Sequence, residues 1–188
     1  MTYQRRQPPN LLKQQLKLSS LIIPEYYAAH TAIWSGEYNE YLGDGGRGSL
    51  KSTFAATEVV LLVMRVPNIH AVVLRKVGNR HLWKQTKKPY TLTYVPTGQT
   101  IQFYGLDDPG KLKSIAVPFG YFGVMHFEEF DQYDGPEEIR NVEQSVFRGG
   151  PFSFSFKTFN SPAMARHWVN RYKREAKPKQ FRHHTTYL

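Results

Sequence analysis

Cysteine is absent from the 188 residues of this chain, which excludes disulfide bonds and metal sites built from thiolates. Long apolar runs are absent as well, and no stretch approaches the ~20 residues that a membrane-spanning helix needs. The first ten residues are polar and lack the apolar segment of a secretory signal. We therefore expect an intracellular protein that does not enter a membrane.

Acidic residues are scarce relative to basic ones, with 15 Asp and Glu against 25 Lys and Arg, so the formal net charge is +10. An excess of this size favours a polyanionic partner, nucleic acid before an anionic membrane surface. A merely soluble basic protein remains the alternative. The length and a hydrophobic content of 40% indicate one packed domain, or one domain with an arm.

The most informative stretch is rich in glycine and reads Gly43-Asp44-Gly45-Gly46-Arg47-Gly48-Ser49-Leu50-Lys51-Ser52-Thr53. Its spacing is close to that of a phosphate-binding P-loop, G-x-x-x-x-G-K-[ST], in which backbone N–H groups cradle phosphates. Lys51 would reach the β and γ phosphates, and the Ser52 hydroxyl would ligate Mg²⁺. Leu50 stands where the pattern has its last glycine, so an ordinary glycine-rich turn remains the alternative for this stretch alone.

The flanking residues predict the strand, loop and helix that a P-loop requires. We expect a strand over 38–42, and a helix over 52–65 that Pro67 closes. The apolar run 69–75 predicts a strand covered on both faces, and this order of elements predicts a parallel sheet. Short helices are expected over 11–23 and 26–34, where Tyr26, Tyr27 and Trp34 either join the core or lie beside a nucleotide base.

No helical pattern follows the strand that ends at Arg75, although parallel strands are normally joined through a crossover helix. The chain passes instead to a hairpin with strands over 90–95 and 99–105 and a turn at Pro96-Thr97-Gly98. We therefore expect a segment to be missing near Asn79–Arg80.

A second motif is the apolar strand over 121–127, which ends in the adjacent carboxylates Glu128 and Glu129. A sheet that delivers two acids in this way can offer one to Mg²⁺ and the next to the attacking water. More acidic residues follow, so a solvated acidic loop is the alternative. The P-loop upstream favours the functional interpretation.

The last third of the chain predicts a helix over 136–147, a strand over 152–159, a helix over 163–175 and a strand over 181–188. Asn160 follows a strand end, where ligands bind in open α/β sheets, and could sense a γ-phosphate; Asn160-Ser161-Pro162 is equally an ordinary turn. Basic residues are densest over 163–182, a region that either contacts DNA phosphates or is a solvated face. Because the chain stops without a cap or turn, we expect it to be truncated.

Four motifs, covering roughly residue 35 to the end, carry a family resemblance: Gly-Gly-Arg-Gly-Ser-Leu-Lys-Ser (45–52), Val-Val-Leu-Arg-Lys-Val-Gly-Asn (72–79), Val-Met-His-Phe-Glu-Glu-Phe-Asp-Gln (124–132) and Phe-Asn-Ser-Pro (159–162). Together they resemble the ATPase half of the phage large terminase subunit, the motor that packages double-stranded DNA into procapsids. The resemblance implies an α/β fold of the P-loop NTPase (ASCE/RecA-like) type, with a mostly parallel sheet flanked by helices and a β-hairpin insertion. It also implies an ATPase core over 35–188, and we expect residues 1–34 to form an N-terminal arm with lid helices.

By position, the resemblance implies ATP and Mg²⁺ as cofactors. It makes Lys51 a phosphate ligand, Ser52 and Glu128 the metal ligands, Glu129 the catalytic carboxylate and Arg47 an arginine that offsets transition-state charge. The implied nucleotide-binding residues are Gly45, Gly46, Arg47, Gly48, Ser49, Leu50, Lys51, Ser52, Thr53 and Asn160. Asn160 is also central to the coupling motif over 158–162, and Arg75 matches a strand-end arginine without an assigned role.

The implied partners are double-stranded DNA, the portal and procapsid, and the small terminase subunit, with a homo-oligomeric ring as the active form in the host cell cytoplasm. Nothing in this sequence matches the family's C-terminal nuclease domain. Two alternatives remain: a helicase-like ATPase stimulated by nucleic acid, and a non-catalytic fragment that binds nucleotide or DNA.

Overall fold

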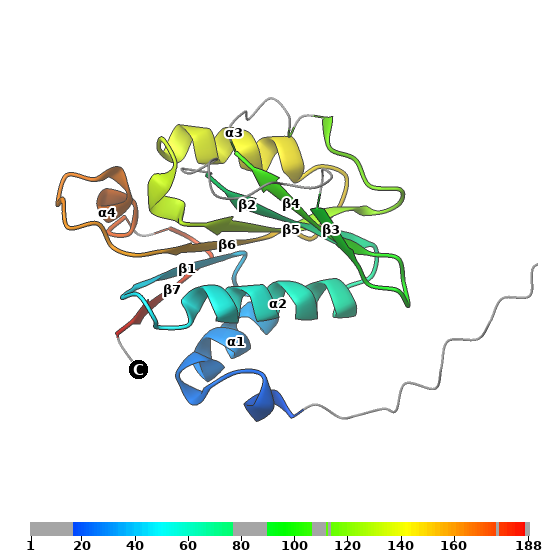
Figure 1. Ribbon diagram of the computed structural model, residues 1–188, viewed down its shortest axis with the longest axis horizontal. Coiled ribbons are helices and arrows are strands. Elements are labelled where there is room, and N and C mark those ends of the chain that lie inside the picture. The colour runs from blue at the N-terminus through cyan, green and yellow to red at the C-terminus, as the bar shows by residue number, and fades with distance from the viewer. Residues whose placement is uncertain (1–16, 77–89, 107–111, 113, 176, 187–188) are drawn as a thin grey trace, which may run out of the picture.

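A seven-stranded sheet forms the centre of the computed structural model, which describes residues 17–76, 90–106, 112, 114–175 and 177–186 (Figure 1). The strand order is β3-β4-β2-β5-β6-β1-β7. Every pairing is parallel except that of β3 with β4, which is antiparallel. The predicted α/β fold with a mostly parallel sheet and a hairpin is therefore confirmed.

The strands of the sheet are β1 (Glu40–Gly45), β2 (Ile69–Arg75), β3 (Tyr90–Thr93), β4 (Thr100–Gly105), β5 (Tyr121–Glu128), β6 (Phe154–Phe159) and β7 (Gln180–Thr185). The α-helices are α1 (Tyr27–Trp34), α2 (Lys51–Arg65), α3 (Pro136–Val146) and α4 (Trp168–Tyr172). Short 3₁₀ turns occur at η1 (Leu18–Ser20), η2 (Pro24–Tyr26) and η4 (Phe130–Gln132). None of the helices within this described part has the length and hydrophobicity that crossing a bilayer would require.

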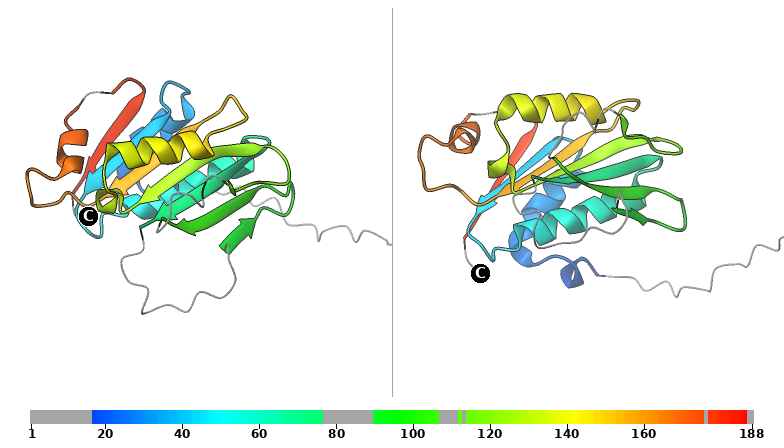
Figure 2. Two further views of the ribbon diagram at one scale, coloured as in Figure 1. Left: turned by 90° about the horizontal axis from the view of Figure 1, so that it is seen from above. Right: turned by 45° about the horizontal axis from the view of Figure 1, so that its top comes forward.

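Helices cover both faces of the twisted sheet, with α1 and α2 below it and α3 and α4 above it in Figure 1; Figure 2 shows the twist from two further directions. On the α2 face, Phe54 and Leu62 pack against Tyr41 and Phe156 of the sheet. On the α3 face, a second cluster joins α3 and α4 to the strands through side chains that include Ile139, Val169 and Phe127. Burying each large apolar side chain contributes about 1.5–3 kcal/mol, so both helix layers are fixed firmly to the sheet.

Several predicted elements are confirmed because their signals are local. Helix α2, strand β2, the β3–β4 hairpin, helix α3 and the strands β5, β6 and β7 all lie where the pattern predicted them. The 26–34 helix is confirmed as α1, preceded by the turn η2.

Three boundaries were wrong. Strand β1 continues to Gly45, because β6 and β7 pair with it on both sides as far as Asp44 and Gly45; the loop is therefore shorter than the glycine pattern suggested. The helix over 163–175 is reduced to α4, because the Asn170 side-chain amide donates to the carbonyls of Pro162 and Met164 and keeps the preceding segment a loop. Within the described part of 11–23, the helical structure is the turn η1.

The expected break near Asn79–Arg80 and the final residues 187–188 lie outside the described residues. The six parallel strands all point the same way, so their carboxyl ends lie at one edge of the sheet. In open α/β sheets this is the edge where ligands bind.

Candidate functional site

One row of paired residues crosses the sheet at its carboxyl edge and brings the predicted motifs together. In register order the row is Gly105, Arg75, Glu128, Thr158, Gly43 and His183. Neighbouring strands lie about 4.8 Å apart, and only β6 separates the strand of Glu128 from the strand that leads into the glycine-rich loop. The acidic and the basic motif therefore share one edge of the sheet.

The alternation of side chains places these groups on one face as well. Ala71 and Val124 belong to the apolar cluster on the α2 face, and Arg75 and Glu128 lie four residues further along the same strands. Because side chains in a strand alternate with period two, Arg75 and Glu128 also lie on the α2 face. This is the face on which α2 begins with Lys51.

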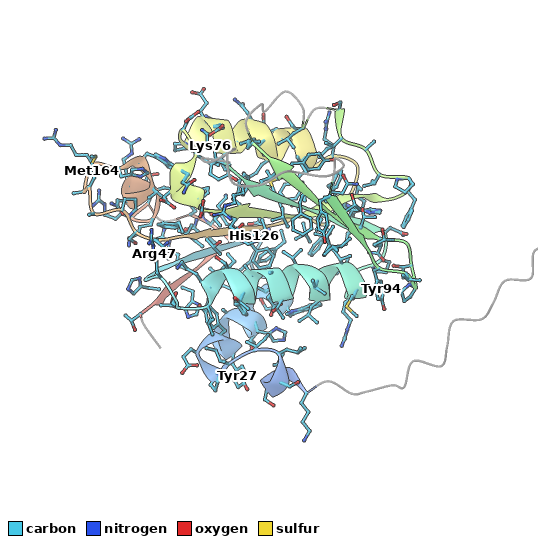
Figure 3. The ribbon with its side chains drawn as sticks, in the orientation of Figure 1. Tyr27, Arg47, Lys76, Tyr94, His126 and Met164 are labelled. Atoms are coloured by element: carbon cyan, nitrogen blue, oxygen red, sulfur yellow. The ribbon has the colours of Figure 1, made fainter. Side chains whose placement is uncertain are left out.

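The loop between β1 and α2 encloses a hollow of about 270 Å³, lined by Arg47, Gly48, Ser49, Leu50, Lys51, Ser52, Thr53 and Asn160. All eight residues were predicted to bind nucleotide, and Figure 3 shows Arg47 at this end of the sheet. Gly45 and Gly46 do not line it, because Gly45 is the last residue of β1 and Gly46 turns its carbonyl toward Lys51. These predicted residues therefore line one hollow at the start of α2.

Lys51 is held at the base of this hollow by fixed oxygens. Its Nζ donates to the carbonyl of Gly46 at 2.8 Å and to Asn160 Oδ1 at 2.7 Å, and it lies 3.5 Å from Ser49 Oγ. Burial lowers the pKa of the Lys51 ammonium, while the carboxylates of Asp44 and Asp131 act in the opposite direction. The contact with Asn160 connects the start of α2 directly to the end of β6.

Residues from both ends of the chain hold the loop in this shape. The buried Tyr26 hydroxyl donates to the Ser49 carbonyl at 2.5 Å, and Thr185 Oγ1 donates to Ser49 Oγ at 2.9 Å. Tyr26 also stacks on Phe54 with ring centroids 4.4 Å apart. Tyr26 is therefore a support for the loop and a core residue, so its ring is not free to stack on a base.

The predicted catalytic carboxylate is paired with the strand-end arginine. Arg75 Nε lies 3.1 Å from Glu129 Oε2 and Arg75 Nη2 lies 2.5 Å from Glu129 Oε1, a two-point pair; Arg75 Nη1 is 4.0 Å from Glu128 Oε2. The hydrogen bonds that Arg75 donates to Glu129 raise the pKa of Arg75 above its usual value. The pair gives Arg75 a place in the site that the sequence did not assign.

A buried imidazole joins the two strands that carry the acidic pair and Asn160. His126 lies inside the sheet (Figure 3), and its Nε2 is 2.9 Å from Thr158 Oγ1. Burial lowers the pKa of His126 to about 4, so the ring is neutral at pH 7. This hydrogen bond fixes β5 against β6 two residues before Glu128 and two residues before Asn160.

Asp44 connects β1 to neighbouring segments on the face of the sheet opposite α2. Its Oδ2 accepts hydrogen bonds from Ser161 Oγ at 2.9 Å and from Lys173 Nζ at 2.6 Å, and lies 3.0 Å from His184 Nδ1. Burial alone would raise the pKa of Asp44, but hydrogen bonds from Lys173, His184 and Ser161 hold it below its usual value. The strand before the loop is thereby tied to α4 and β7.

The donor chemistry at this edge suits Mg²⁺ bound together with phosphate. Ser52 and Glu128 offer hydroxyl and carboxylate oxygens, which Mg²⁺ prefers. Within the described residues, no group of three or more His, Cys, Asp or Glu side chains could hold a metal ion by itself. Mg²⁺ commonly completes its shell with water and substrate phosphates, so these two residues fit such a site.

Leu50 adopts the left-handed backbone conformation, with φ 59° and ψ 10°, that the missing glycine of the pattern would adopt freely. A non-glycine residue there costs about 1–2 kcal/mol, and a β-branched residue more. We expect the unfolding free energy of Leu50→Gly to equal or exceed that of the natural chain. We expect Leu50→Ile, an isomer of the natural residue, to be about 1 kcal/mol less stable than Leu50→Gly.

Urea unfolding of the natural chain and the two variants, compared at equal m-values, measures the three unfolding free energies. If the Ile variant matched the natural chain and the Gly variant were the weakest, packing of the Leu50 side chain would decide stability here, not its backbone.

Comparisons with known proteins identify the family to which the chain is related. A family model described as phage terminase large subunit matches residues 80–188. The large terminase subunit of Bacillus phage SPP1 is 32% identical over 181 residues, covering 84% of this chain and 43% of that protein. A solved structure described as "The Phi-28 gp11 DNA packaging Motor" superposes with a TM-score of 0.52 at 13% identity, covering 79% of this chain and 57% of that one, a likeness of fold alone.

Proposed function

Because the chain belongs to the family of phage terminase large subunits, we propose that it binds Mg²⁺ and ATP at the Arg47–Thr53 hollow and hydrolyses the nucleotide. Hydrolysis would drive the packaging of double-stranded DNA into procapsids. The chain spans less than half of the length of its SPP1 relative, so the proposal concerns the motor part of such a protein. The observation that carries it is the shared edge of Lys51, Asn160, Glu128 and Glu129.

The chain's own groups can perform each part of the reaction. The loop amides and Lys51 bind the phosphates, and Lys51 with Arg47 offsets the charge that spreads over the γ-phosphoryl oxygens. Glu129 orients a water molecule and accepts its proton. Mg²⁺, when held by Ser52 and Glu128, would supply further neutralisation of phosphate charge. Asn160 would sense the terminal phosphate through its contact with Lys51.

Arg75 is a positioning residue in this proposal. Its two-point contact sets the orientation of the Glu129 carboxylate at the end of β5. Glu129 is in the left-handed conformation, with φ 52°, and the ion pair contributes to holding it there. To accept a proton from water, the carboxylate has to release at least one of the two contacts.

The partners follow from the same proposal. They are double-stranded DNA, the portal and procapsid, and the small terminase subunit, with a homo-oligomeric ring as the working form in the host cytoplasm. In this assignment residues 35–188 form the ATPase core and residues 1–34 an arm that supports the loop through Tyr26. An arginine acting on the γ-phosphate could come from Arg47 or from a neighbouring subunit of the ring.

Replacing Lys51 tests the proposed nucleotide site. We expect Lys51→Ala to weaken ATP binding about 10–100-fold, because charge-assisted hydrogen bonds contribute ~1.5–3 kcal/mol each. Titration with a fluorescent ATP analogue measures binding, and phosphate release measures hydrolysis. Lys17→Ala, which removes an exposed lysine that does not line the hollow, is the matched control and should behave as the natural chain.

Equal binding by Lys51→Ala and the natural chain would contradict the site. Nucleotide binding without any phosphate release by the natural chain would favour the non-catalytic fragment. Phosphate release that DNA stimulates without procapsids, together with strand separation, would favour the helicase-like alternative.

A further inference from the structure

The loop between β1 and α2 takes a strained backbone conformation at one residue. Leu50 stands where the P-loop pattern has glycine, and its φ of 59° and ψ of 10° lie in the left-handed region that glycine adopts freely. Leu50 is 46% exposed, so packing of its side chain contributes little to holding this conformation. Among the described residues, no side chain caps the start of α2 either. The support for this conformation therefore comes from another part of the fold.

A buried tyrosine holds the peptide group that precedes Leu50. The Tyr26 hydroxyl lies 2.5 Å from the Ser49 carbonyl oxygen, and both residues are 1% exposed. Burial raises the pKa of the Tyr26 hydroxyl, which therefore stays protonated near pH 7 and donates to the carbonyl. Because water does not compete for this carbonyl, the hydroxyl fixes the direction of the Ser49 C=O bond.

The direction of this carbonyl sets the direction of the Leu50 amide. A trans peptide group is planar, and its C=O and N–H bonds point in opposite directions. The Leu50 N–H therefore points away from Tyr26, and Leu50 lines the hollow whereas Tyr26 does not. Among the described residues, no acceptor contacts this N–H. It is therefore available to a phosphate oxygen, as the amides of a P-loop are.

Rotation of this peptide group would relieve the strain and damage the site. A half-turn changes the φ of Leu50 by about 180°, from 59° to the extended region that leucine adopts without strain. The carbonyl oxygen of Ser49 would then face the hollow in place of the N–H and repel phosphate oxygens. With leucine at this position the fold has to oppose the rotation, and the hydrogen bond from Tyr26 does so.

The position of Tyr26 is itself fixed. Its ring stacks on Phe54 of α2 with centroids 4.4 Å apart. Further along α2, the buried Glu58 carboxylate lies 2.7 Å from His30 Nδ1 and accepts a hydrogen bond from Trp34 Nε1 at 2.9 Å. These contacts hold α1 against α2, and Figure 1 shows the two helices on one face of the sheet. The hydroxyl therefore stays in place when the peptide group turns.

Resting on the function proposed above, we propose that Tyr26 is a positioning residue of the nucleotide site. Its hydroxyl holds the Ser49–Leu50 peptide group so that the Leu50 N–H faces the phosphates. It thereby replaces the conformational freedom that a glycine would give the loop. Tyr26 does not touch the nucleotide and acts through the backbone of the loop, so the turn η2 contributes to the phosphate site.

The test is a double-mutant cycle between Tyr26 and Leu50, with binding of a fluorescent ATP analogue and Mg²⁺ as the readout. Tyr26→Phe keeps the ring and its stacking on Phe54 and removes the hydroxyl. We expect it to weaken binding ~5–10-fold in the natural chain, the size of one ordinary hydrogen bond. In the Leu50→Gly chain, where the left-handed conformation carries no strain, the same change is expected to weaken binding less than about twofold.

Two controls separate positioning from a general loss of structure. Urea unfolding identifies conditions in which all four proteins of the cycle are folded, and binding is measured there. Tyr27→Phe removes the hydroxyl of the neighbouring, partly buried tyrosine and should bind the analogue as the natural chain does. A hydroxyl with a merely structural role would cost the same binding with and without Leu50→Gly.

An equal loss of binding from Tyr26→Phe with and without Leu50→Gly overturns the proposal. Unchanged binding by Tyr26→Phe in the natural chain, or an equal loss from Tyr27→Phe, overturns it as well. In each of these cases, a natural chain that binds the analogue and weakens on Lys51→Ala leaves the proposed function standing. A natural chain that does not bind the analogue contradicts both proposals.

Discussion

Glu129→Gln is expected to bind ATP as the natural chain does and to lose turnover about 10²–10⁴-fold, the range that a general base contributes. The amide keeps the shape of the side chain and can still accept a hydrogen bond from Arg75, but it cannot take a proton from water. Nucleotide titration and single-turnover phosphate release measure the two effects separately. A wild-type rate of phosphate release would remove Glu129 from the role of base.

Glu137→Gln is the matched control for this variant. Glu137 is an exposed glutamate in the first turn of α3 and is not one of the residues in the row at the carboxyl edge. The same substitution there should leave both binding and turnover unchanged. A loss of turnover in both variants would point to general destabilisation and not to chemistry at the end of β5.

Replacing the buried Lys157 is expected to have a large effect on the stability of the fold. Lys157 on β6 is 1% exposed, and its Nζ lies 2.6 Å from Glu40 Oε2, 2.9 Å from Glu143 Oε1 and 2.9 Å from the Tyr172 hydroxyl. Burial alone would lower the pKa of Lys157, but Glu143 and Glu40 raise it above its usual value. Burial alone would likewise raise the pKa of Glu40, and Lys157 holds it below its usual value.

Lys157→Met is expected to lower the unfolding free energy by up to about 3–5 kcal/mol, because it leaves the partly buried carboxylates of Glu40 and Glu143 without their counterion. That is a large share of the ~5–15 kcal/mol that stabilises a typical domain. Adding Glu40→Gln and Glu143→Gln should restore much of the loss, since replacing a whole buried ion cluster is often nearly neutral. Urea unfolding of the single and triple variants measures both steps. Equal stability of the natural chain and Lys157→Met would show that the cluster contributes little.

The sequence predicted the parts of the fold whose signals are local. The apolar run of β2 and the 3.6-residue pattern of α2 depend on neighbours in the chain, and both ended within one residue of the prediction. The end of β1 depends on pairing with β6 and β7, which no local pattern contains. The length of helix α4 was overestimated because the side chain of Asn170 holds the segment before the helix as a loop, a contact that no local pattern shows.

For the candidate site too, the sequence predicted the residues with local signals and missed the contacts between distant residues. Spacing indicated the loop, Lys51 and the acidic pair. The contacts of Tyr26 and Thr185 with Ser49 were not predicted, because these residues lie 23 and 136 positions away from it in the sequence. Asp44 was treated as one residue of a glycine-rich loop, although its partners Ser161, Lys173 and His184 lie more than 100 positions later. The sequence placed Arg75 at the end of a strand, but it did not predict the ion pair of Arg75 with Glu129, which the fold shows.

A crystal structure of the chain with a non-hydrolysable ATP analogue and Mg²⁺ is the most direct test of the proposed nucleotide site. We expect the triphosphate in the Arg47–Thr53 hollow, with its terminal phosphate against Lys51 Nζ, the metal between Ser52 and Glu128, and Glu129 facing the γ-phosphorus. A nucleotide bound elsewhere on the chain, or a terminal phosphate remote from both Lys51 and the glutamates, would contradict it.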